Sequence, residues 1–304
     1  MKLQPIVSHL FLVPGAARGQ FPFAHCVLAD SSPVTLIDAG CGLGSLDELV
    51  ELSQPEQVII SHSHPDHCAG CSLLEDLPIH VPKAAAQTFG DKDKLAERFF
   101  GRDPVGEQWK SFVTGAMGFE NCSFTDTYAD GDQFRLGDMT FVAIAAPGHS
   151  ADHMALFEAA TGVLISFDID LTPFGPWYGN PESDIGQLRR SIQNLADLEP
   201  RVVVTSHMGI IRKNIQEAFN RYLHVIDARH GAIAELVSAG CDTIDALVGF
   251  SPIYGRHEGR HAALTRWWER AMIQKHLDML EAEDRIRRRN DGHYEALHPG
   301  RRHL

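Results

Sequence analysis

The chain has 304 residues, of which 44% are hydrophobic and 22% are charged, a balance typical of a globular protein with one large domain and an appended unit. Its formal net charge of -13 produces a field that repels polyanions, which disfavours nucleic acid as a partner. No segment approaches the roughly 20 consecutive apolar residues of a membrane span, and polar residues interrupt the N-terminus before a signal-peptide core forms. We therefore expect a cytoplasmic protein with no membrane contact.

The first forty residues predict a strand-rich opening. Three short apolar runs, 6–14, 23–30 and 33–40, are separated by Gly, Pro and Ser. Residues 43–54 have the pattern of a helix, and a short buried strand follows from residue 57. This alternation is typical of a sheet covered by helices.

The strand that starts at residue 57 leads into a dense cluster of potential metal ligands. Residues 61–67 read Ser-His-Ser-His-Pro-Asp-His. In an extended backbone His62 and His64 point the same way and can hold one ion together. Pro65 keeps His64 extended and stands where a helix can begin, so Asp66 and His67 face another direction, towards a second ion.

Cys68 and Cys71 follow this cluster as a CxxC pair. The chain has no second CxxC that would complete four zinc ligands, and its six cysteines are scattered. We interpret these two as buried structural thiols in a reducing cytoplasm rather than as a redox pair.

Residues 83–119 are mostly helical in pattern and carry bulky aromatic side chains, which predicts a helical insertion near the site entrance. Strand signals resume in the stretches 126–150, 154–170 and 201–207. Each of the three stretches carries a potential ligand near its end, His149, Asp168 and His207 respectively. This repeated arrangement predicts that the donors meet at one edge of a layered fold.

Other histidines are interpreted as ordinary polar residues, because a single His at a strand end is more often satisfied locally than a ligand. This interpretation covers His25, His80, His153, His224 and His276.

Beyond Met208 strand signals cease and helical periodicity takes over, which predicts a C-terminal helical unit over residues 211–304. Residues 285–297 follow a long helix and contain an Asp-Gly turn, so we expect a helix followed by a small hairpin, as in a winged helix. The sequence does not decide whether this helical end forms a homodimer.

The cluster at 61–67, followed by His149, Asp168 and His207, resembles the signature of the metallo-β-lactamase superfamily, in which HxHxDH precedes a His, a bridging Asp and a final His. The glyoxalase II-like and lactamase-β-2-like hydrolases are members of this kind. The resemblance covers roughly residues 5 to 210 and implies an α+β fold, an αββα sandwich, as a domain over residues 1–210. The region 211–304 would be appended to it.

The resemblance also implies the ligand set. One metal would be held by His62, His64 and His149, a second by Asp66, His67 and His207, with Asp168 bridging both. Asp38 matches an aspartate that supports the ligand loop from behind. Asp170 competes with Asp168, but Asp168 is preferred because it directly follows the apolar strand.

Two divalent ions roughly 3.5 to 4 Å apart lower the pKa of a shared water and polarise the electrophile that it attacks. Zinc is the first expectation, with iron or manganese as alternatives. Asp168 would fix the spacing of the ions and Asp66 would orient a metal-bridging hydroxide, so these two are the predicted catalytic residues. We expect a hydrolase of a small ester, thioester or lactone.

Two residues of the signature distinguish this chain from particular families of the superfamily and narrow the class of reaction. His64 stands where the flavodiiron reductases have a Glu, and Asp168 stands where true β-lactamases have Cys or Ser, which disfavours oxygen reduction and antibiotic hydrolysis. Two alternatives stay open: a metal-dependent ribonuclease, since the C-terminal end resembles that of family nucleases, and a mononuclear iron sulfur dioxygenase. A basic run, interpreted mainly as a solvated face, consists of Arg285, Arg287, Arg288 and Arg289.

Residues 170–180 should line a pocket, because Phe174, Trp177 and Tyr178 directly follow the aspartates. Tyr178 and Tyr254 are both candidates to donate a hydrogen bond to an oxyanion, and the sequence does not choose between them. We also expect Trp109 or Trp177 to lie close to the metals.

Overall fold

The computed structural model describes residues 2–257, 259 and 261–297, so the outermost ends of the two predicted units lie outside the described residues. Seven strands form the first sheet in chain order: β1 (Gln4–Val7), β2 (Leu10–Val13), β3 (Cys26–Ala29), β4 (Thr35–Ile37), β5 (Gln57–Ile59), β6 (Ile79–Pro82) and β7 (Asp126–Tyr128). From β4 to β7 neighbouring strands are parallel, and β1 to β4 are antiparallel.

The prediction of one strand over residues 6–14 is wrong. The chain reverses at Ser8, whose φ of 33° is left-handed, and β1 pairs antiparallel with β2. The pattern hid this turn because neither Ser8 nor His9 is the Gly or Asn that usually marks a tight reversal.

The second sheet has the order β13-β12-β11-β10-β9-β8. Its strands are β8 (Gln133–Leu136), β9 (Met139–Ala145), β10 (Met154–Glu158), β11 (Val163–Phe167), β12 (Val202–Thr205) and β13 (Gly209–Ile211). Strand signals were expected to end at Met208, but β13 continues the sheet antiparallel to β12. Gly209, with φ 76°, begins this three-residue strand, which is too short for a periodic pattern.

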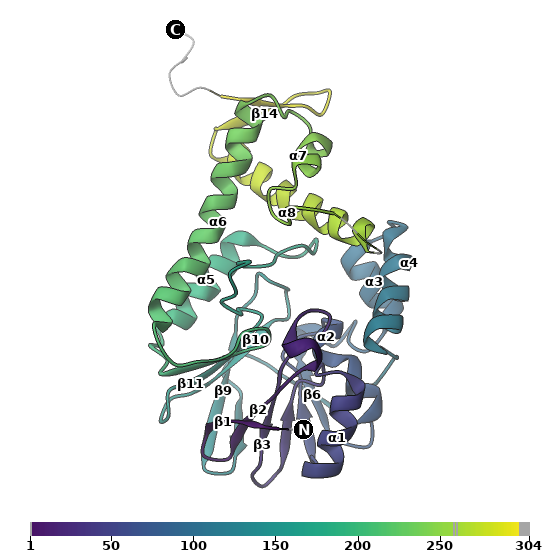
Figure 1. Cartoon of the computed structure of the whole chain (residues 1–304), viewed down its shortest axis with the longest axis vertical. Coiled ribbons are helices and arrows are strands. Elements are labelled where there is room, and N and C mark those ends of the chain that lie inside the picture. Colours follow the sequence, from purple (N-terminus) through teal and green to yellow (C-terminus); the bar gives the residue numbers. More distant parts are fainter. Residues whose placement is uncertain (1, 258, 260, 298–304) are drawn as a thin grey trace.

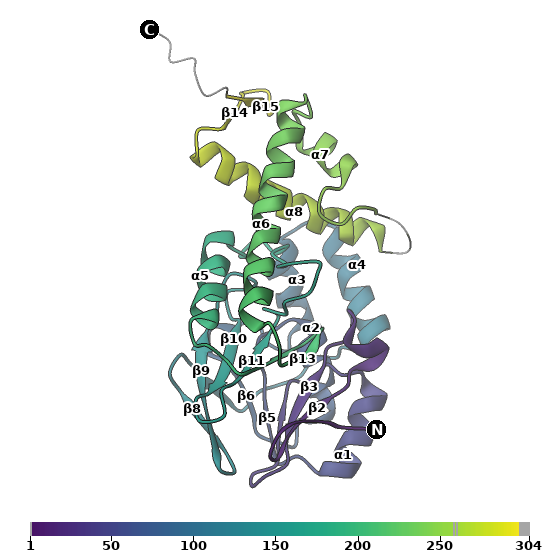
Figure 2. The same ribbon diagram turned by 60° about the vertical axis from the view of Figure 1, so that its left-hand side comes forward.

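The two sheets pack face to face with helices outside, which confirms the predicted αββα sandwich (Figures 1 and 2). Between the sheets lie fully buried side chains such as Leu12, Ile37 and Phe141. Helices α1 (Leu43–Ser53), α3 (Lys92–Phe100) and α4 (Val105–Phe112) belong to the core outside the first sheet, and α5 (Ile185–Ala196) and α6 (Ile215–Ser238) to the core outside the second.

Short helical turns complete this part of the chain. They are α2 (Pro65–Cys68), the 3-10 turns Ala16–Gly19, Ala69–Leu73 and Lys83–Ala85, and a π turn at Val113–Met117. The segment 83–119 is thus helical, as its pattern predicts.

The C-terminal region consists of the upper half of α6, α7 (Ile244–Phe250), α8 (Ala262–Ala282) and a hairpin of β14 (Ile286–Arg288) and β15 (Tyr294–Ala296). The Asp-Gly turn predicted this hairpin, and Gly292 occupies it with φ 84°. Helix α6 rises out of the sandwich, and α8 begins beside α4 and runs past α6 to the hairpin (Figure 1). The domain boundary near residue 210 stays a prediction. Among the described residues, no helix has both the length and the apolar character needed to cross a bilayer.

Candidate metal centre

The predicted ligands all lie just beyond strand ends on one edge of the sandwich. The loop after β5 carries residues 61–67, the loop after β9 carries His149, and Asp168 and the Ser206–His207 turn follow β11 and β12. The backbone of Phe167 has φ 48°, and the register between β11 and β12 shifts just before it. A left-handed bulky residue costs about 1–3 kcal/mol, and here it turns Asp168 out of the strand.

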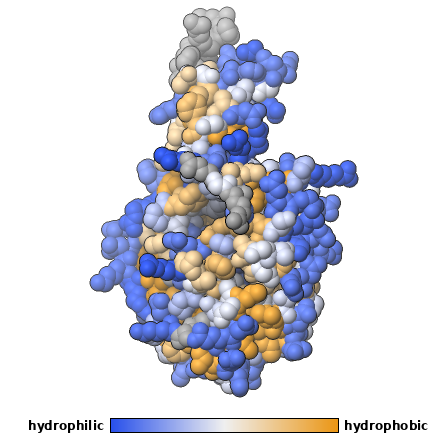
Figure 3. Space-filling view, turned by 45° about the vertical axis from the view of Figure 1, so that its right-hand side comes forward, coloured by the Kyte–Doolittle hydropathy of each residue, from blue (hydrophilic) through white to orange (hydrophobic). Residues whose placement is uncertain are grey.

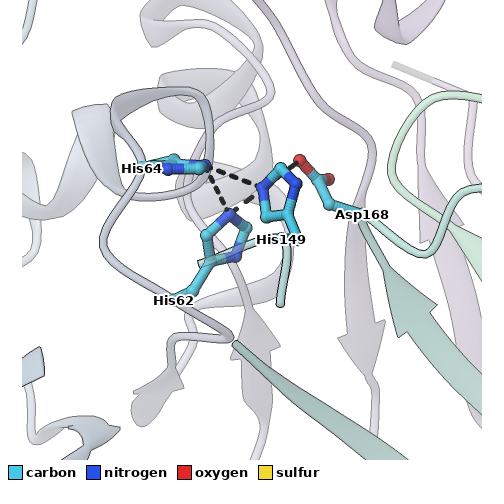
Figure 4. A group of neighbouring side chains, drawn as sticks. All are labelled: His62, His64, His149 and Asp168. Carbon is cyan, nitrogen blue, oxygen red and sulfur yellow. Dashed lines mark hydrogen bonds and ion pairs between the residues drawn. The ribbon is translucent and has the colours of Figure 1, made fainter. Parts of the chain in front are cut away.

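The first group of donors is formed by His62, His64 and His149. The Nδ1 atom of His64 lies 3.0 Å from Nε2 of His62 and 2.9 Å from Nε2 of His149. Figure 4 shows the three rings converging, with the Asp168 carboxylate beside His149. Asp168 Oδ2 lies 3.2 Å from His149 Nε2, so the carboxylate joins this group.

The second group contains Asp66, His67 and His207. Asp168 Oδ1 lies 2.9 Å from Nε2 of His67 and 3.5 Å from Nε2 of His207. Asp66 Oδ2 lies 3.7 Å from the same His207 atom. Asp168 is thus a member of both groups and turns one oxygen to each.

Four of the five imidazole rings in the two groups contact a hydrogen-bond acceptor through the ring nitrogen that points away from the centre. The Nδ1 atoms of His149 and His207 lie 3.0 Å and 2.7 Å from the carbonyl oxygens of Trp177 and Gly19. A carbonyl only accepts, so each of these rings carries its proton on Nδ1 and turns the Nε2 lone pair inward.

Asp38, fully buried behind the ligand loop, does the same for two more rings. It accepts from the backbone N–H of Ser61 at 2.8 Å and the Ser61 hydroxyl at 2.9 Å, and lies 2.7 Å from Nδ1 of His67. Because the Ser61 hydroxyl donates to Asp38, its oxygen is left to accept from Nδ1 of His62 at 3.0 Å. Asp38 thus lies behind the ligand loop, in the supporting position that was predicted. A Cβ at Gly40 would lie 1.5 Å from the Asp66 carbonyl oxygen, so glycine is required for this close approach.

His64 is held by a residue that the sequence analysis missed. The buried amide of Asn180 lies 2.7 Å from its Nε2 atom, with Nδ2 nearest. When Nδ1 of His64 binds an ion, Nε2 carries the proton, and the amide then turns its oxygen to accept it.

This arrangement fits cations. The Nε2 lone pairs of His62 and His149 both face Nδ1 of His64, which has at most one proton to share between them. Burial alone would lower the pKa of His67 and His207, but Asp168 outweighs it and raises the pKa of both rings, so a positive charge is favoured beside these carboxylates. Within the described residues, the buried His67 Nε2 and Asp168 Oδ1 atoms lack a hydrogen-bond partner although they lie 2.9 Å apart. Burial, with the neighbouring imidazoles, lowers the pKa of His62 and His64 well below its ordinary value and keeps them neutral, as metal ligands must be. Imidazole and carboxylate sets of this kind suit divalent metal ions.

Asp170 belongs to neither group of donors. Its Oδ1 atom accepts from the backbone N–H of Thr172 at 3.1 Å, and burial raises the pKa of its carboxyl. The structure therefore brings Asp168, and not Asp170, to the centre.

His153 has a local role that single-residue reasoning did not foresee. Its Nδ1 atom donates to the Ala146 carbonyl at 3.1 Å, which leaves Nε2 to accept from the backbone N–H of Asp168 at 3.3 Å. This imidazole therefore fixes the backbone of the shared aspartate. The spacing of His149 and His153, four residues apart after a strand, was the available signal.

An ion pair between a partly buried arginine and a buried aspartate links the helical insertion to the ligand loops. Arg98 of α3 binds both oxygens of Asp152 at 3.0 and 3.2 Å, and Asp152 accepts from the backbone N–H of Ser63 at 3.1 Å. Arg98 also binds the Ser63 hydroxyl and Glu182. Ser63 lies between two ligands, so the insertion helix stabilises the loop that presents them.

A cavity of about 420 Å³ opens on the donors, a size at the lower end of small-molecule sites. Phe174 and Trp177 line it, as predicted, but Tyr178 does not. Tyr178 is fully buried, with its hydroxyl 2.8 Å from Nε2 of His276, whereas Tyr254 lines the cavity. Cys68 and Cys71 are buried and free, as expected for structural thiols.

Tryptophan fluorescence should report ligand binding. The Trp177 ring lies 5.4 Å from His149 and 5.7 Å from His64, and both Trp177 and Trp109 line the cavity. We expect product to change the emission of wild type and of a Trp267→Phe control, whose ring instead packs on Phe100 at 4.7 Å. Trp177→Phe should lose most of the change. Unchanged wild-type emission under conditions where equilibrium dialysis shows binding would contradict this placement.

Comparisons with known proteins agree with this centre. The model of the metallo-beta-lactamase superfamily matches residues 21–207. An uncharacterized protein of Aquifex aeolicus is 23% identical over 204 residues, which cover 64% of this chain and 89% of that one. The beta-lactamase-like protein 2 homolog of Caenorhabditis elegans is 25% identical over 172 residues, 54% of this chain and 46% of that protein.

Solved structures share the fold. A metallo-beta-lactamase family protein from Thermus thermophilus has a TM-score of 0.72 at 19% identity, covering 96% of this chain and 100% of that chain. A beta-lactamase domain protein from Burkholderia ambifaria has a TM-score of 0.70 at 18% identity, covering 97% and 94%. With the family model matched over more than half of the chain and the donor groups in place, the chain belongs to the metallo-β-lactamase superfamily.

Proposed function

We propose that this protein is a dinuclear metal-dependent hydrolase of a small ester, thioester or lactone. The observation that carries the proposal is that Asp168 turns one carboxylate oxygen to each of two donor groups, beside a cavity of small-molecule size. When bound, the two ions supply a hydroxide at neutral pH and an electrophilic partner for the substrate carbonyl. We expect zinc at both positions, with iron or manganese as alternatives.

The residues of the chain divide this work. His62, His64 and His149 would hold one ion, and Asp66, His67 and His207 the other, with Asp168 fixing their separation. Asp66 also lines the cavity, and its carboxylate would accept a hydrogen bond from the attacking hydroxide and orient it. The imidazoles keep their orientation because their outer nitrogens are already bound.

The nuclease alternative loses support from the surface of the C-terminal unit. Three of the four arginines of the basic run form ion pairs: Arg287 with Glu295 at 2.9 Å, Arg289 with Asp291 at 2.9 Å and Arg285 with Glu283 at 3.4 Å. Paired arginines contribute less to phosphate binding than free ones.

The metal content provides a direct test. Protein purified without added metal and then reconstituted should hold two ions per chain, whereas His149→Ala and His207→Ala should each hold about one, because each removes a ligand from a different group. Elemental analysis checks this. Less than about one ion per wild-type chain, after zinc, manganese and iron have each been tried, would contradict a dinuclear centre.

The activity test is a screen of metal-loaded protein against thioesters, esters, lactones and RNA. Turnover of an acyl substrate that is lost on chelation supports the proposal. Salt-sensitive RNA cleavage without acyl hydrolysis would replace it with the nuclease, and one iron per chain with thiol oxygenation would replace it with the dioxygenase.

A further inference from the structure

We propose that the cavity selects acyl substrates whose acyl chain is uncharged and apolar. This inference rests on the proposed function, since it names the substrate class of the same site. It comes from the side chains that surround the donors, which belong to several separate segments of the chain.

The wall of the cavity is apolar and aromatic beyond the metal-binding residues. All lining residues that are charged or carry an imidazole belong to the two donor groups. The Asn180 amide, which also lines the cavity, is bound to His64. Lysine and arginine are absent from the described lining. The remaining lining residues are Phe21, Pro65, Phe99, Trp109, Met117, Phe174, Trp177, Tyr254, Thr265 and Trp268.

Two arginines beside this wall, Arg98 and Arg229, are already bound to other groups. Arg98 is bound to Asp152 and Glu182 at 3.0 and 2.8 Å. Arg229 donates to the carbonyl oxygens of Phe174 and Pro176 and lies behind the Phe174 ring, 4.7 Å from its centroid. A carboxylate on the substrate, away from the reacting carbonyl, would therefore lose water and meet no lysine or arginine among the described lining residues.

The aromatic walls are preformed. The Trp268 ring on α8 meets Trp177 edge-on at 5.9 Å and Phe21 at 6.1 Å, while Phe99 meets Trp109 at 5.6 Å. Figure 3 shows apolar patches on the face where the C-terminal unit meets the sandwich, among hydrophilic surroundings. Rings locked against one another offer an apolar surface without an ordering cost on binding.

One neutral hydrogen-bond donor faces this space. Trp177 Nε1–H donates to the Tyr254 hydroxyl oxygen at 2.7 Å, and no described residue accepts the proton of that hydroxyl. Burial raises the pKa of Tyr254, so the proton stays. The buried carboxylate of Glu269 fixes this tyrosine by accepting from the backbone N–H groups of Ile253 and Tyr254, both at 2.9 Å. The Tyr254 hydroxyl can therefore donate a hydrogen bond to a substrate oxygen, but the described lining holds no lysine or arginine that would balance the charge of a substrate carboxylate.

The test compares two acyl chains of equal length. Metal-loaded wild type is assayed with the N-acetylcysteamine thioesters of hexanoic acid and of adipic acid, which differ only by a terminal carboxylate. We expect kcat/KM to favour the hexanoyl compound by about 100-fold or more, because an unpaired buried charge costs several kcal/mol. Binding of the matching ketones, in which CH2 replaces the sulfur, is followed by tryptophan fluorescence and should show the same preference without any hydrolysis.

Two variants at the cavity rim sharpen the comparison. Thr265→Lys places a cation in the wall and should reduce the hexanoyl preference at least about 10-fold, whereas Thr265→Met, of similar length but uncharged, should keep it. Equal or better binding and turnover of the adipoyl compounds by wild type overturns the inference. Absence of turnover on every acyl substrate, with the ketone preference intact, instead overturns the proposed hydrolase while the apolar specificity of the cavity stands.

Discussion

Asp168→Ala should lower turnover by more than about 100-fold without unfolding the protein, since the electrostatic work of a two-metal centre is worth several kcal/mol. Its two oxygens face the two donor groups, and without them two bound cations would repel each other with no carboxylate between them. The ion near His207 should weaken most, because the other group keeps three imidazoles. The cores on both sides of the sheets are untouched by the change.

Asp170→Ala is the matched control. This carboxyl lies two residues away and is also buried, but it binds the Thr172 backbone rather than a donor group. Its loss should cost about 10- to 100-fold at most, as for residues that support a ligand. Metal content, turnover and thermal melting are measured side by side. The assignment of Asp168 as the bridging residue would be wrong if Asp168→Ala kept two tightly held ions and near-normal turnover while Asp170→Ala lost both.

Arg98→Met should lower the free energy of unfolding by about 3–5 kcal/mol, because it leaves the Asp152 carboxylate buried without its cation. Urea unfolding of metal-free protein gives the difference. Arg102→Met, an exposed arginine beyond the end of the same helix, should change stability by less than about 0.5 kcal/mol. The double variant Arg98→Met with Asp152→Asn should recover part of the loss, since it removes the unpaired charge.

The same pair has a pH signature. Burial alone would raise the pKa of Asp152, but Arg98 outweighs it and holds that pKa well below its usual range. The pair therefore contributes stability above the unfolded pKa of about 3.9, and this contribution is lost as pH falls through the lower folded value. The deficit of Arg98→Met should shrink in acid. A deficit independent of pH, or no deficit at neutral pH, would show that the pair does not stabilise the loop.

The convergence of the candidate donors was predictable because their geometry is local. His62 and His64 share a side of an extended backbone, and the other donors each follow an apolar strand, so spacing alone places them at one edge. Asp168 and Asp170 were separable only by which of them directly follows β11, and the structure agrees with that choice.

The supporting residues were not predictable in this way, because distant segments bring them together. Arg98 and Asp152 are 54 residues apart, and Asn180 meets His64 across 116 residues. Neither pair leaves a periodic trace in the sequence. The choice between Tyr178 and Tyr254 likewise depended on how α8 packs over the sandwich: Tyr178 lies beneath it against His276, and Tyr254 is held at the cavity by Glu269.

The candidate metal-binding residues and several residues of the cavity wall come from different parts of the fold, which affects how the substrate specificity of this protein can change in evolution. Every candidate metal-binding atom comes from a segment that directly follows a strand end, whereas Phe99, Trp109 and Trp268 reach the cavity from α3, α4 and α8. Substitutions at such wall positions alter which molecules fit without disturbing the atoms that break the bond. Lineages that keep the same seven donors can therefore acquire new substrates by changing helices alone, and the sequence of α8 should be a better guide to substrate than the metal signature.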